Sequence, residues 1–220
     1  MKSSIIVPAY NEADAIMSVI NGIKLLGMED REIIVVDDGS LDSTYDIVKG
    51  IDGITVLKHE RNMGKGVALK TGIEHSKGDV IITIDADGTY SANDIPGLIG
   101  KMEEGYDMAI GSRFLGKINS MPKIRFFGNI FFSKMVSLAG GKKISDASSG
   151  LRAFRKHIIS DMKIGSRNLS WEVEVTAKFL RKGFRIAEVP IEYSERKGKS
   201  KLRIWKDGFS FLFAILRSVV

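Results

Sequence analysis

The sequence predicts an α/β fold in which a mostly parallel β-sheet carries helices on both faces. Three observations indicate it: aliphatic runs of strand length recur in the first half of the chain, amphipathic stretches separate them, and polar clusters follow them. Strands that are apolar throughout are typical of a parallel sheet that is covered on both faces. Ligands of such sheets bind beyond the carboxyl ends of the strands, so a site is expected at that edge.

The first half of the chain supplies the strands and helices of this sheet. Five aliphatic runs have strand length: 3–9, 31–38, 53–58, 79–85 and 107–112. Two stretches between them have apolar residues at helical spacing: Ile16, Val19, Ile20, Ile23 and Leu26, then, more weakly, Val67, Leu69 and Ile73. Alternation of strands and helices predicts βαβ units, and therefore parallel pairing.

The second half, from about residue 113, is less regular. It contains an apolar helix over 124–140, a helix around 170–183 and a strand over 185–193. No proline-rich or serine-rich linker separates the halves. We therefore expect one domain over 1–220, in which a C-terminal extension completes the site of the sheet-based half.

Composition narrows the kind of site that is possible. The chain has 220 residues, of which 44% are hydrophobic and 27% charged, which is ordinary for a globular protein. It contains no cysteine, so disulfides and thiolate metal sites are excluded. Metal ligands must then be oxygen atoms or histidine. No apolar stretch reaches the roughly 20 residues that a membrane-spanning helix needs.

Positive charge is concentrated near the C-terminus. The window 181–206 holds nine basic residues against three acids, which accounts for the whole formal charge of +6. A basic patch beside an apolar tail indicates anionic lipid or a phosphorylated ligand. We expect no nucleic-acid partner, because that would more often be met by basic residues spread over the fold with aromatics between them. A solvated basic face is the alternative.

Two clusters of carboxylates stand where predicted strands end. Asp85 and Asp87 would point to the same side of an extended chain, about 7 Å apart. Two hard oxygen donors suit Mg²⁺ or Mn²⁺, which usually take one or two carboxylates and phosphate oxygens of a substrate. A capped turn is the alternative for a single aspartate. A second cluster, Asp37 and Asp38, ends another strand of the same sheet, and the coincidence favours a site.

Three kinds of site could use this pattern. A phosphoacceptor receiver domain is much shorter than this chain and would leave the second half unexplained. A P-loop is excluded, because Gly64, Lys65 and Gly66 lack both its spacing and the Ser or Thr that follows its lysine. A transferase that holds a nucleotide diphosphate through a metal makes use of every cluster.

An ordered set of motifs supports the transferase. The chain carries IIVPAYNEAD, IIVVDDGSLDST, RNMGKGVALKTGI, GDVIITIDADGTY, GSRF, SDASSGLRAF, SWEVEV and ERKGKSKL. In this order they resemble family 2 glycosyltransferases of the GT-A fold, and within them the dolichyl-phosphate or polyprenyl-phosphate mannose and glucose synthases. The resemblance covers residues 3 to 206. Each motif alone is weak, whereas the ordered set is specific.

The resemblance implies a nucleotide-sugar side over 1–112. Its residues would be Pro8, Ala9, Tyr10, Glu12, Asp38, Lys65, Asp85 and Ala86. Asp87 would be the direct ligand of Mg²⁺ or Mn²⁺, with Asp85 as the second metal residue. Mannose synthases of this type often continue with leucine and a coordinating glutamine, where this chain has Gly88 and Thr89. The third ligand is therefore left unassigned, and the DADG stretch is closer to the glucose-type members.

The resemblance places the acceptor side over 113–206. Basic positions around the two phosphates, which we class as catalytic together with Asp87, would be Arg113, Arg125, Arg196 and Lys201. The acceptor or sugar side would include Asp146, Ser149, Gly150, Arg152, Trp171, Glu172, Glu174 and Ser200. Glu172 and Glu174 cannot both face one way on a helix, so sugar-side and structural roles are both open for them.

The activity that the resemblance implies is inverting, metal-dependent transfer of mannose or glucose from GDP-mannose or UDP-glucose to dolichyl or polyprenyl phosphate. The apolar stretches 124–138 and 209–220, the second in an amphipathic tail over 207–220, would be interfacial helices of a peripheral protein on the cytoplasmic face of a membrane. Core packing is the alternative for the first stretch. A saccharide or protein acceptor, and a non-catalytic nucleotide- or lipid-binding module, are the competing interpretations.

Overall fold

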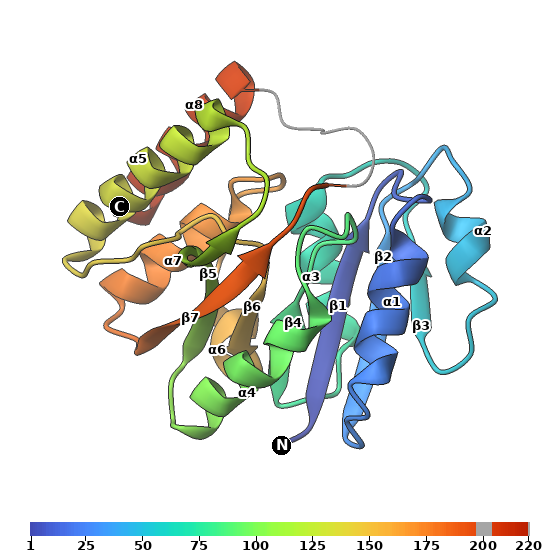
Figure 1. Ribbon diagram of the computed structural model, residues 1–220. Coiled ribbons are helices and arrows are strands. Elements are labelled where there is room, and N and C mark those ends of the chain that lie inside the picture. Colours follow the sequence, from blue (N-terminus) through green and yellow to red (C-terminus); the bar gives the residue numbers. More distant parts are fainter. Residues whose placement is uncertain (197–203, 220) are drawn as a thin grey trace.

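Seven strands form one mixed sheet in the part of the chain that the structure, a computed structural model, describes: residues 1–196 and 204–219. Their spatial order is β3-β2-β1-β4-β6-β5-β7 (Figure 1). The strands are β1 Ser3–Ala9, β2 Arg31–Asp37, β3 Thr55–Lys58, β4 Val80–Thr83, β5 Met108–Ile118, β6 Arg152–Arg155 and β7 Ile186–Tyr193. The helices are α1 Ile16–Leu25, α2 Thr44–Val48, α3 Lys65–His75, α4 Ile95–Glu103, α5 Lys123–Gly140, α6 Lys156–Asp161, α7 Trp171–Arg181 and α8 Ile204–Val219, with a 3-10 turn η1 at Ala92–Asp94.

All strands but β6 run in one direction. Parallel pairing joins β1 to β2 and β4, β2 to β3, and β5 to β7. The strand β6 lies antiparallel between β4 and β5. The carboxyl ends of β1, β2, β4, β5 and β7 therefore meet at one edge, the upper one in Figure 1, together with the loop that leads into β6.

Helices cover both faces because alternate residues of each strand point to opposite sides. On β1, Ile6 belongs to a core cluster with Leu69 of α3 and with residues of α5, α7 and α8. Its neighbour Ile5 belongs to a second cluster with Ile20 of α1 and residues of α4. The predicted α/β arrangement with helices on both faces is confirmed.

Each of the five aliphatic runs contains a strand, and the predicted helices correspond to α1, α3, α5 and α7. The predicted helical tail corresponds to α8, whereas β6, α2, α4, α6 and the turn η1 were not predicted. The strand β6 has four residues with arginine at both ends, and α4 begins IPGLIG, in which proline and glycine hide the helical period. Short or glycine-rich elements carry too little pattern to be recognised.

The strand β5 continues beyond Ser112, where the predicted strand ended. Its register against β7 shifts between Ser112 and Lys117, which marks a bulge. Gly116 permits this, because a Cβ there would lie 2.0 Å from the carbonyl oxygen of Ile191. Bulges bend a strand and redirect side chains beside it. Here the irregular stretch begins with Arg113, at the upper edge of the sheet.

The helices α5 and α8 lie side by side beyond β5 and pack on α7 (Figure 1). The rings of Phe132 and Phe211 meet edge to face with centroids 4.9 Å apart. Gly140 brings α5 against α7, since a Cβ there would lie 2.5 Å from the Cβ of Leu180. Over the described residues, no helix has the combination of length and apolar character that crossing a membrane requires.

Candidate active site

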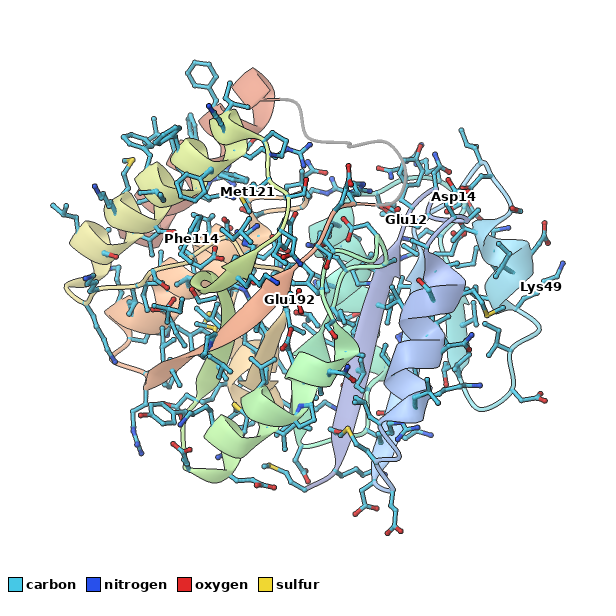
Figure 2. The ribbon with its side chains drawn as sticks, in the orientation of Figure 1. Glu12, Asp14, Lys49, Phe114, Met121 and Glu192 are labelled. Carbon is cyan, nitrogen blue, oxygen red and sulfur yellow. The ribbon has the colours of Figure 1, made fainter. Side chains whose placement is uncertain are left out.

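The upper edge of the sheet carries a cleft of about 770 Å³. Loops after β1, β2, β4, β5 and β7 form one part of its wall, and α3, α5, α7 and α8, with the loops before α3 and α7, complete it. Figure 2 shows Glu12 near the upper end of β1 and Met121 across the same edge, beside α5. The predicted site residues that line the cleft are Pro8, Ala9, Tyr10, Glu12, Asp38, Lys65, Asp85, Ala86, Asp87, Arg113, Arg125, Glu172 and Arg196.

Lys65 connects two carboxylates in the cleft. Its Nζ lies 2.6 Å from Asp85 Oδ1 and 2.6 Å from Glu172 Oε1. Lys65 begins α3, Asp85 follows β4 and Glu172 lies in the first turn of α7, so one ammonium group joins three elements. Burial alone would lower the pKa of Lys65, but the two carboxylates outweigh it and raise that pKa above its ordinary value. The lysine is therefore a permanent positive charge.

Asp87 is held by donors on both oxygens. Its Oδ1 accepts hydrogen bonds from the backbone N–H of Thr89, at 3.0 Å, and from the Thr89 hydroxyl, at 2.6 Å. Gly88 has a φ of +75°, which turns the chain so that Thr89 folds back. Oδ2 accepts from Nη1 of Arg196 at 2.7 Å, and Nη2 of the same guanidinium donates to Glu12. Gly88 and Thr89 thus fix the orientation of Asp87.

Asp38 shapes the loop that precedes α3. Its Oδ1 accepts from the backbone N–H of Met63 at 2.9 Å and lies 2.7 Å from His59 Nδ1, and its Oδ2 accepts from the N–H of Gly64 at 2.8 Å. Gly64 has a φ of +104°, and a Cβ there would lie 2.3 Å from Asn168 Oδ1. The carboxylate lines the cleft and at the same time fixes the start of α3.

Arg113 and Asp146 form a buried ion pair. Nε donates to Oδ2 and Nη2 to Oδ1, both at 2.7 Å, and the Arg113 backbone N–H also donates to Oδ2. Nη2 reaches Ser148 Oγ at 2.9 Å, and the guanidinium carbon lies 5.3 Å from the centre of the Tyr193 ring. Burial lowers the pKa of Arg113, but Asp146 outweighs it and the pKa is raised well above the ordinary value. Asp146 is fully buried, so it orients Arg113 from behind the cleft wall.

Ser149 and Arg152 also lie behind the cleft wall. Arg152 is completely buried and donates to the carbonyl oxygens of Ser149, at 2.6 Å, and Ala147, at 2.5 Å. It also donates to Thr176 Oγ1 of α7 at 2.7 Å. Burial lowers the pKa of Arg152. The arginine thereby ties the loop before β6 to α7, and Ser149 is buried in that loop.

Gly150 lies directly against Asp85. A Cβ at Gly150 would stand 2.6 Å from Asp85 Oδ2, so any larger residue there would push this carboxylate aside. The Gly150 N–H donates to the hydroxyl of Tyr90 at 2.9 Å, and its carbonyl accepts from Thr83 Oγ1 at 2.9 Å. Gly150 therefore supports the carboxylate rather than lining the cleft.

Two residues of α7 lie away from the cleft. Trp171 is buried in the core, with its ring 5.9 Å from that of Phe154. Glu174 accepts from the backbone N–H groups of Gly165, at 2.9 Å, and Ser166, at 2.8 Å, and pairs with Lys178. The helical period sends Glu172 to the cleft and Glu174 to the loop before α7. Ser200 and Lys201, also predicted at the site, lie outside the described residues.

The opposite end of the cleft is apolar. Ile124, Phe132 and Phe211 line it together with Met121, and Arg125 stands among them near the start of α5. These side chains come from α5, α8 and the segment before α5. The cleft therefore runs from a cluster of carboxylates, past Arg113 and Arg125, to a hydrophobic wall.

Sequence reasoning missed several residues of the cleft. Tyr90 and Tyr193 line it and meet edge to face at 5.5 Å. Tyr90 ends the DADGTY stretch and Tyr193 ends a predicted strand, so the strand-end rule could have found both. Asn168 comes from the loop before α7, where no periodic or motif signal exists.

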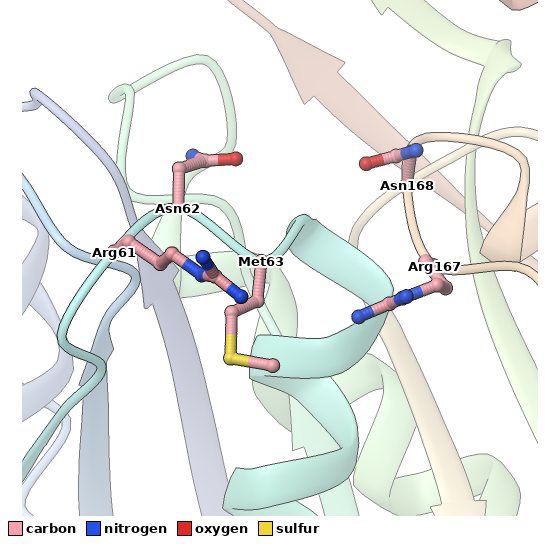
Figure 3. Close-up of a pocket in the computed structure, with 5 residues that line it drawn as sticks. All are labelled: Arg61, Asn62, Met63, Arg167 and Asn168. Carbon is pink, nitrogen blue, oxygen red and sulfur yellow. The ribbon is translucent and has the colours of Figure 1, made fainter.

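A second pocket of about 360 Å³ adjoins the cleft and shares Asn62 and Asn168 with it. Figure 3 shows Arg61 and Arg167 extending from opposite sides toward Met63. Both arginines are exposed to solvent. The loop before α3 and the loop before α7 thus border both hollows.

The charged groups of the cleft fit a divalent cation with its nucleotide. At the carboxylate end, two cationic side chains each pair with two carboxylates: Lys65 with Asp85 and Glu172, and Arg196 with Glu12 and Asp87. These six groups together carry two net negative charges, which one divalent cation would balance. Within 1–196 and 204–219, no group of three or more acidic or histidine ligands occurs. A cation at Asp85 and Asp87 would take further ligands from a diphosphate and water, as Mg²⁺ and Mn²⁺ usually do.

Comparison with known proteins agrees with this geometry. A family model described as "Glycosyl transferase family 2" matches residues 4–162. A dolichyl-phosphate hexose transferase of Haloferax volcanii is 32% identical, over 99% of this chain and 92% of the relative. A UDP-N-acetylglucosamine–dolichyl-phosphate N-acetylglucosaminyltransferase of Methanococcus voltae is 31% identical, over 96% of this chain and 94% of the relative.

A solved structure has the same fold. Glucosyl-3-phosphoglycerate synthase from Mycobacterium tuberculosis, in complex with Mn²⁺, UDP-glucose and phosphoglyceric acid, superposes with a TM-score of 0.82 at 21% identity, over 99% of this chain and 79% of that one. The likeness confirms the GT-A arrangement that the motif order predicted.

Proposed function

The chain belongs to glycosyltransferase family 2, and on that premise we propose that it transfers a hexose from a nucleotide diphosphate sugar to a polyprenyl or dolichyl phosphate. One observation carries the proposal: a single cleft joins a carboxylate cluster, two arginines and a hydrophobic wall. These three parts match the diphosphate with its metal, the acceptor phosphate and the prenyl chain. The names of the two relatives, both of which include dolichyl phosphate, support the same acceptor class.

The donor would bind at the carboxylate end. Asp87 and Asp85 would hold Mg²⁺ or Mn²⁺, which neutralises the charge that develops on the leaving diphosphate. Lys65 adds a permanent positive charge beside Asp85, and Tyr10 offers an aromatic face where the cleft passes the end of β1. GDP-mannose and UDP-glucose are the donors implied by the motifs, and the name of the M. voltae relative adds UDP-N-acetylglucosamine to the candidates.

The acceptor phosphate would face Arg113 and Arg125. A phosphate monoester is ionised at neutral pH, so it can attack the anomeric carbon without a general base. The bond from the phosphate oxygen to that carbon forms while the bond to the diphosphate breaks, and attack from the opposite face inverts the configuration. Arg113, held rigidly by Asp146, needs little reorganisation to orient the nucleophile.

The prenyl chain would leave the cleft along α5 and α8 toward a membrane surface. Phe127 and Phe131 of α5 and Phe209 and Phe213 of α8 are each more than half exposed, which is unusual for four phenylalanines on adjoining helices. Basic residues of the window 181–206 would add attraction to anionic lipid. We propose that the protein acts as a peripheral protein on the cytoplasmic face of the membrane.

Vesicle flotation tests this surface. Phe127→Ser combined with Phe131→Ser is expected to lower binding to phosphatidylcholine vesicles that contain phosphatidylglycerol, because two apolar anchors are lost. Leu25→Ser is the matched control, since Leu25 is 86% exposed but lies on α1. Equal binding of the double variant and the control would contradict a docking surface on α5 and α8.

A donor screen tests the reaction. The protein is incubated with Mn²⁺ and with GDP-mannose, UDP-glucose or UDP-N-acetylglucosamine, with and without dolichyl phosphate or a bacterial polyprenyl phosphate, and released nucleoside diphosphate is measured. We expect one donor to react only when lipid phosphate is present, and Asp87→Asn to abolish that turnover. Turnover stimulated by a soluble saccharide and not by lipid phosphate would overturn the acceptor assignment.

A further inference from the structure

Arg196 joins the two loops that carry the donor-side acids. It lies three residues beyond the end of β7, and its Nη1 reaches Oδ2 of Asp87 at 2.7 Å while its Nη2 contacts Glu12. Asp87 belongs to the loop after β4 and Glu12 to the loop after β1. The Arg196 side chain keeps about a fifth of its surface exposed. One guanidinium thus occupies the position where the charges of two carboxylates meet.

The bonds of Asp87 decide which of its oxygens a cation can use. Oδ1 accepts two hydrogen bonds from Thr89, two residues away, which are local contacts within the turn at Gly88. Oδ2 accepts from Arg196, whose long side chain can move by rotation alone. A divalent cation at this oxygen would repel the guanidinium and withdraw electron density from its hydrogen bond. A cation held at Oδ2 would therefore weaken the contact between Asp87 and Nη1 of Arg196.

Glu12 decides where Arg196 goes when it is displaced. Nη2 pairs with Glu12, so this contact can hold the guanidinium inside the cleft after Asp87 is lost. A guanidinium presents its donors as a planar fork that suits phosphate oxygens. When a cation binds Asp87, Nη1 of Arg196 is free to donate to another acceptor in a cleft that also holds Arg113 and Arg125.

From these contacts we propose that Arg196 is a switch that couples the two substrates: cation and nucleotide at Asp87 release Arg196 to the acceptor phosphate. The inference rests on the proposed function and adds an order to it. Before the donor is loaded, Arg196 is bound by acids and the acceptor phosphate lacks one of its positive partners. Donor binding releases Arg196 to serve as that partner, so lipid phosphate binds best to an enzyme that already holds metal and nucleotide.

Metal affinity separates this role from simple support of Asp87. Mn²⁺ binding in the absence of nucleotide is measured by calorimetry or by the electron paramagnetic resonance of free Mn²⁺. Because a competitor is removed, Arg196→Gln is expected to bind Mn²⁺ more tightly by roughly tenfold, within the range of known site couplings. Arg196→Lys, which keeps one charge but loses the fork, is expected to lie between Arg196→Gln and the wild type. Arg185→Gln, a change at an exposed arginine at the far end of β7, is the control and should match the wild type.

Acceptor binding provides the second readout. Farnesyl phosphate is titrated into wild type and Arg196→Gln, with and without Mn²⁺ and the nucleoside diphosphate of the reactive donor. In the wild type, donor loading is expected to strengthen farnesyl phosphate binding by roughly fivefold or more, and in Arg196→Gln the gain should disappear. Mn²⁺ affinity that is unchanged or weaker in Arg196→Gln would overturn the switch while leaving the proposed function intact. Absence of Mn²⁺ binding to the wild type would overturn both.

Discussion

Replacing Asp146 with asparagine tests whether this residue acts through Arg113. The substitution keeps the shape of the side chain and removes its charge. In the structure the carboxylate is fully buried and receives two charge-assisted hydrogen bonds of 2.7 Å from the guanidinium. The Arg113 side chain is only 7% exposed, so water cannot replace the lost partner. The variant therefore leaves a buried positive charge without its counterion.

The expected cost follows from that burial. Removing one partner of a buried ion pair lowers the free energy of unfolding by about 3–5 kcal/mol. For a chain of this length each kcal/mol shifts the melting midpoint by about 2–4 °C, so Asp146→Asn should melt roughly 6–20 °C lower. Because Arg113 also loses its orientation, we expect kcat to fall at temperatures where the variant is still folded.

Thermal unfolding followed by circular dichroism, with turnover measured well below both midpoints, checks this prediction. Asp46→Asn is the control, since Asp46 pairs with Lys49 at 2.5 Å on the exposed surface and should leave the midpoint unchanged. The double variant Asp146→Asn with Arg113→Gln removes both charges and should recover part of the stability while remaining inactive. A midpoint within about 2 °C of the wild type for Asp146→Asn would refute the reasoning.

Three further predictions concern the surroundings of the carboxylates. Gly150→Ala places a Cβ 2.6 Å from Asp85 Oδ2 and should weaken Mn²⁺ binding by about tenfold. The melting midpoint should change little because the Asp85 side chain can move aside, and an unchanged Mn²⁺ affinity would contradict the close contact. Thr89→Val removes the hydroxyl that orients Asp87 and should weaken Mn²⁺ binding by roughly 10–100-fold, and wild-type affinity would refute this role. Burial of Glu174 acts to raise its pKa, but the backbone N–H donors and the lysine partner outweigh burial, so the pKa lies below the ordinary 4.5. The stabilisation that ionised Glu174 provides is therefore complete above pH 4.5 and is lost as the pH falls through the lower pKa of the folded state. Glu174→Gln should lower the free energy of unfolding at pH 7 by about 2 kcal/mol and flatten its fall below pH 4.5, and an unchanged acid profile in denaturant titrations would contradict this.

The sequence was sufficient for the parallel strands and for the carboxylate end of the cleft because both depend on local pattern. Runs such as 31–38 are apolar without interruption, and their carboxyl ends must share an edge once the sheet is parallel. The pattern of strands alone therefore places Asp38, Asp85 and Asp87 at one edge. The antiparallel β6 was not predicted, because four residues with arginine at each end carry no period.

The second half of the predicted site, over 113–206, was harder to predict because its polar residues serve the fold as often as the cleft. Asp146 and Arg152 belong to the same motif, but their partners are Arg113 and the carbonyl groups of their own loop. A sequence motif gives the types and spacing of its residues, but it does not indicate which side chains face the ligand. Distinguishing a lining residue from one behind it requires the positions of β6 and α7, which fix how that loop turns.

The sugar itself would lie between the two ends of the cleft, where loops and helix starts supply the wall. Ser148 and Asn129 stand there: both line the cleft, Ser148 Oγ donates to Asn129 Oδ1 at 3.1 Å, and Arg113 donates to Ser148 at 2.9 Å. Hydroxyl and amide groups distinguish sugars by the direction of a hydroxyl, since a misplaced one leaves a buried partner unsatisfied. Ser148→Ala is therefore expected to change the ratio of kcat/KM between glucosyl and mannosyl donors by about tenfold while Mn²⁺ affinity stays constant. If that ratio stays the same and only the KM for lipid phosphate rises, Ser148 serves the acceptor through Arg113 and the sugar is read elsewhere in the wall.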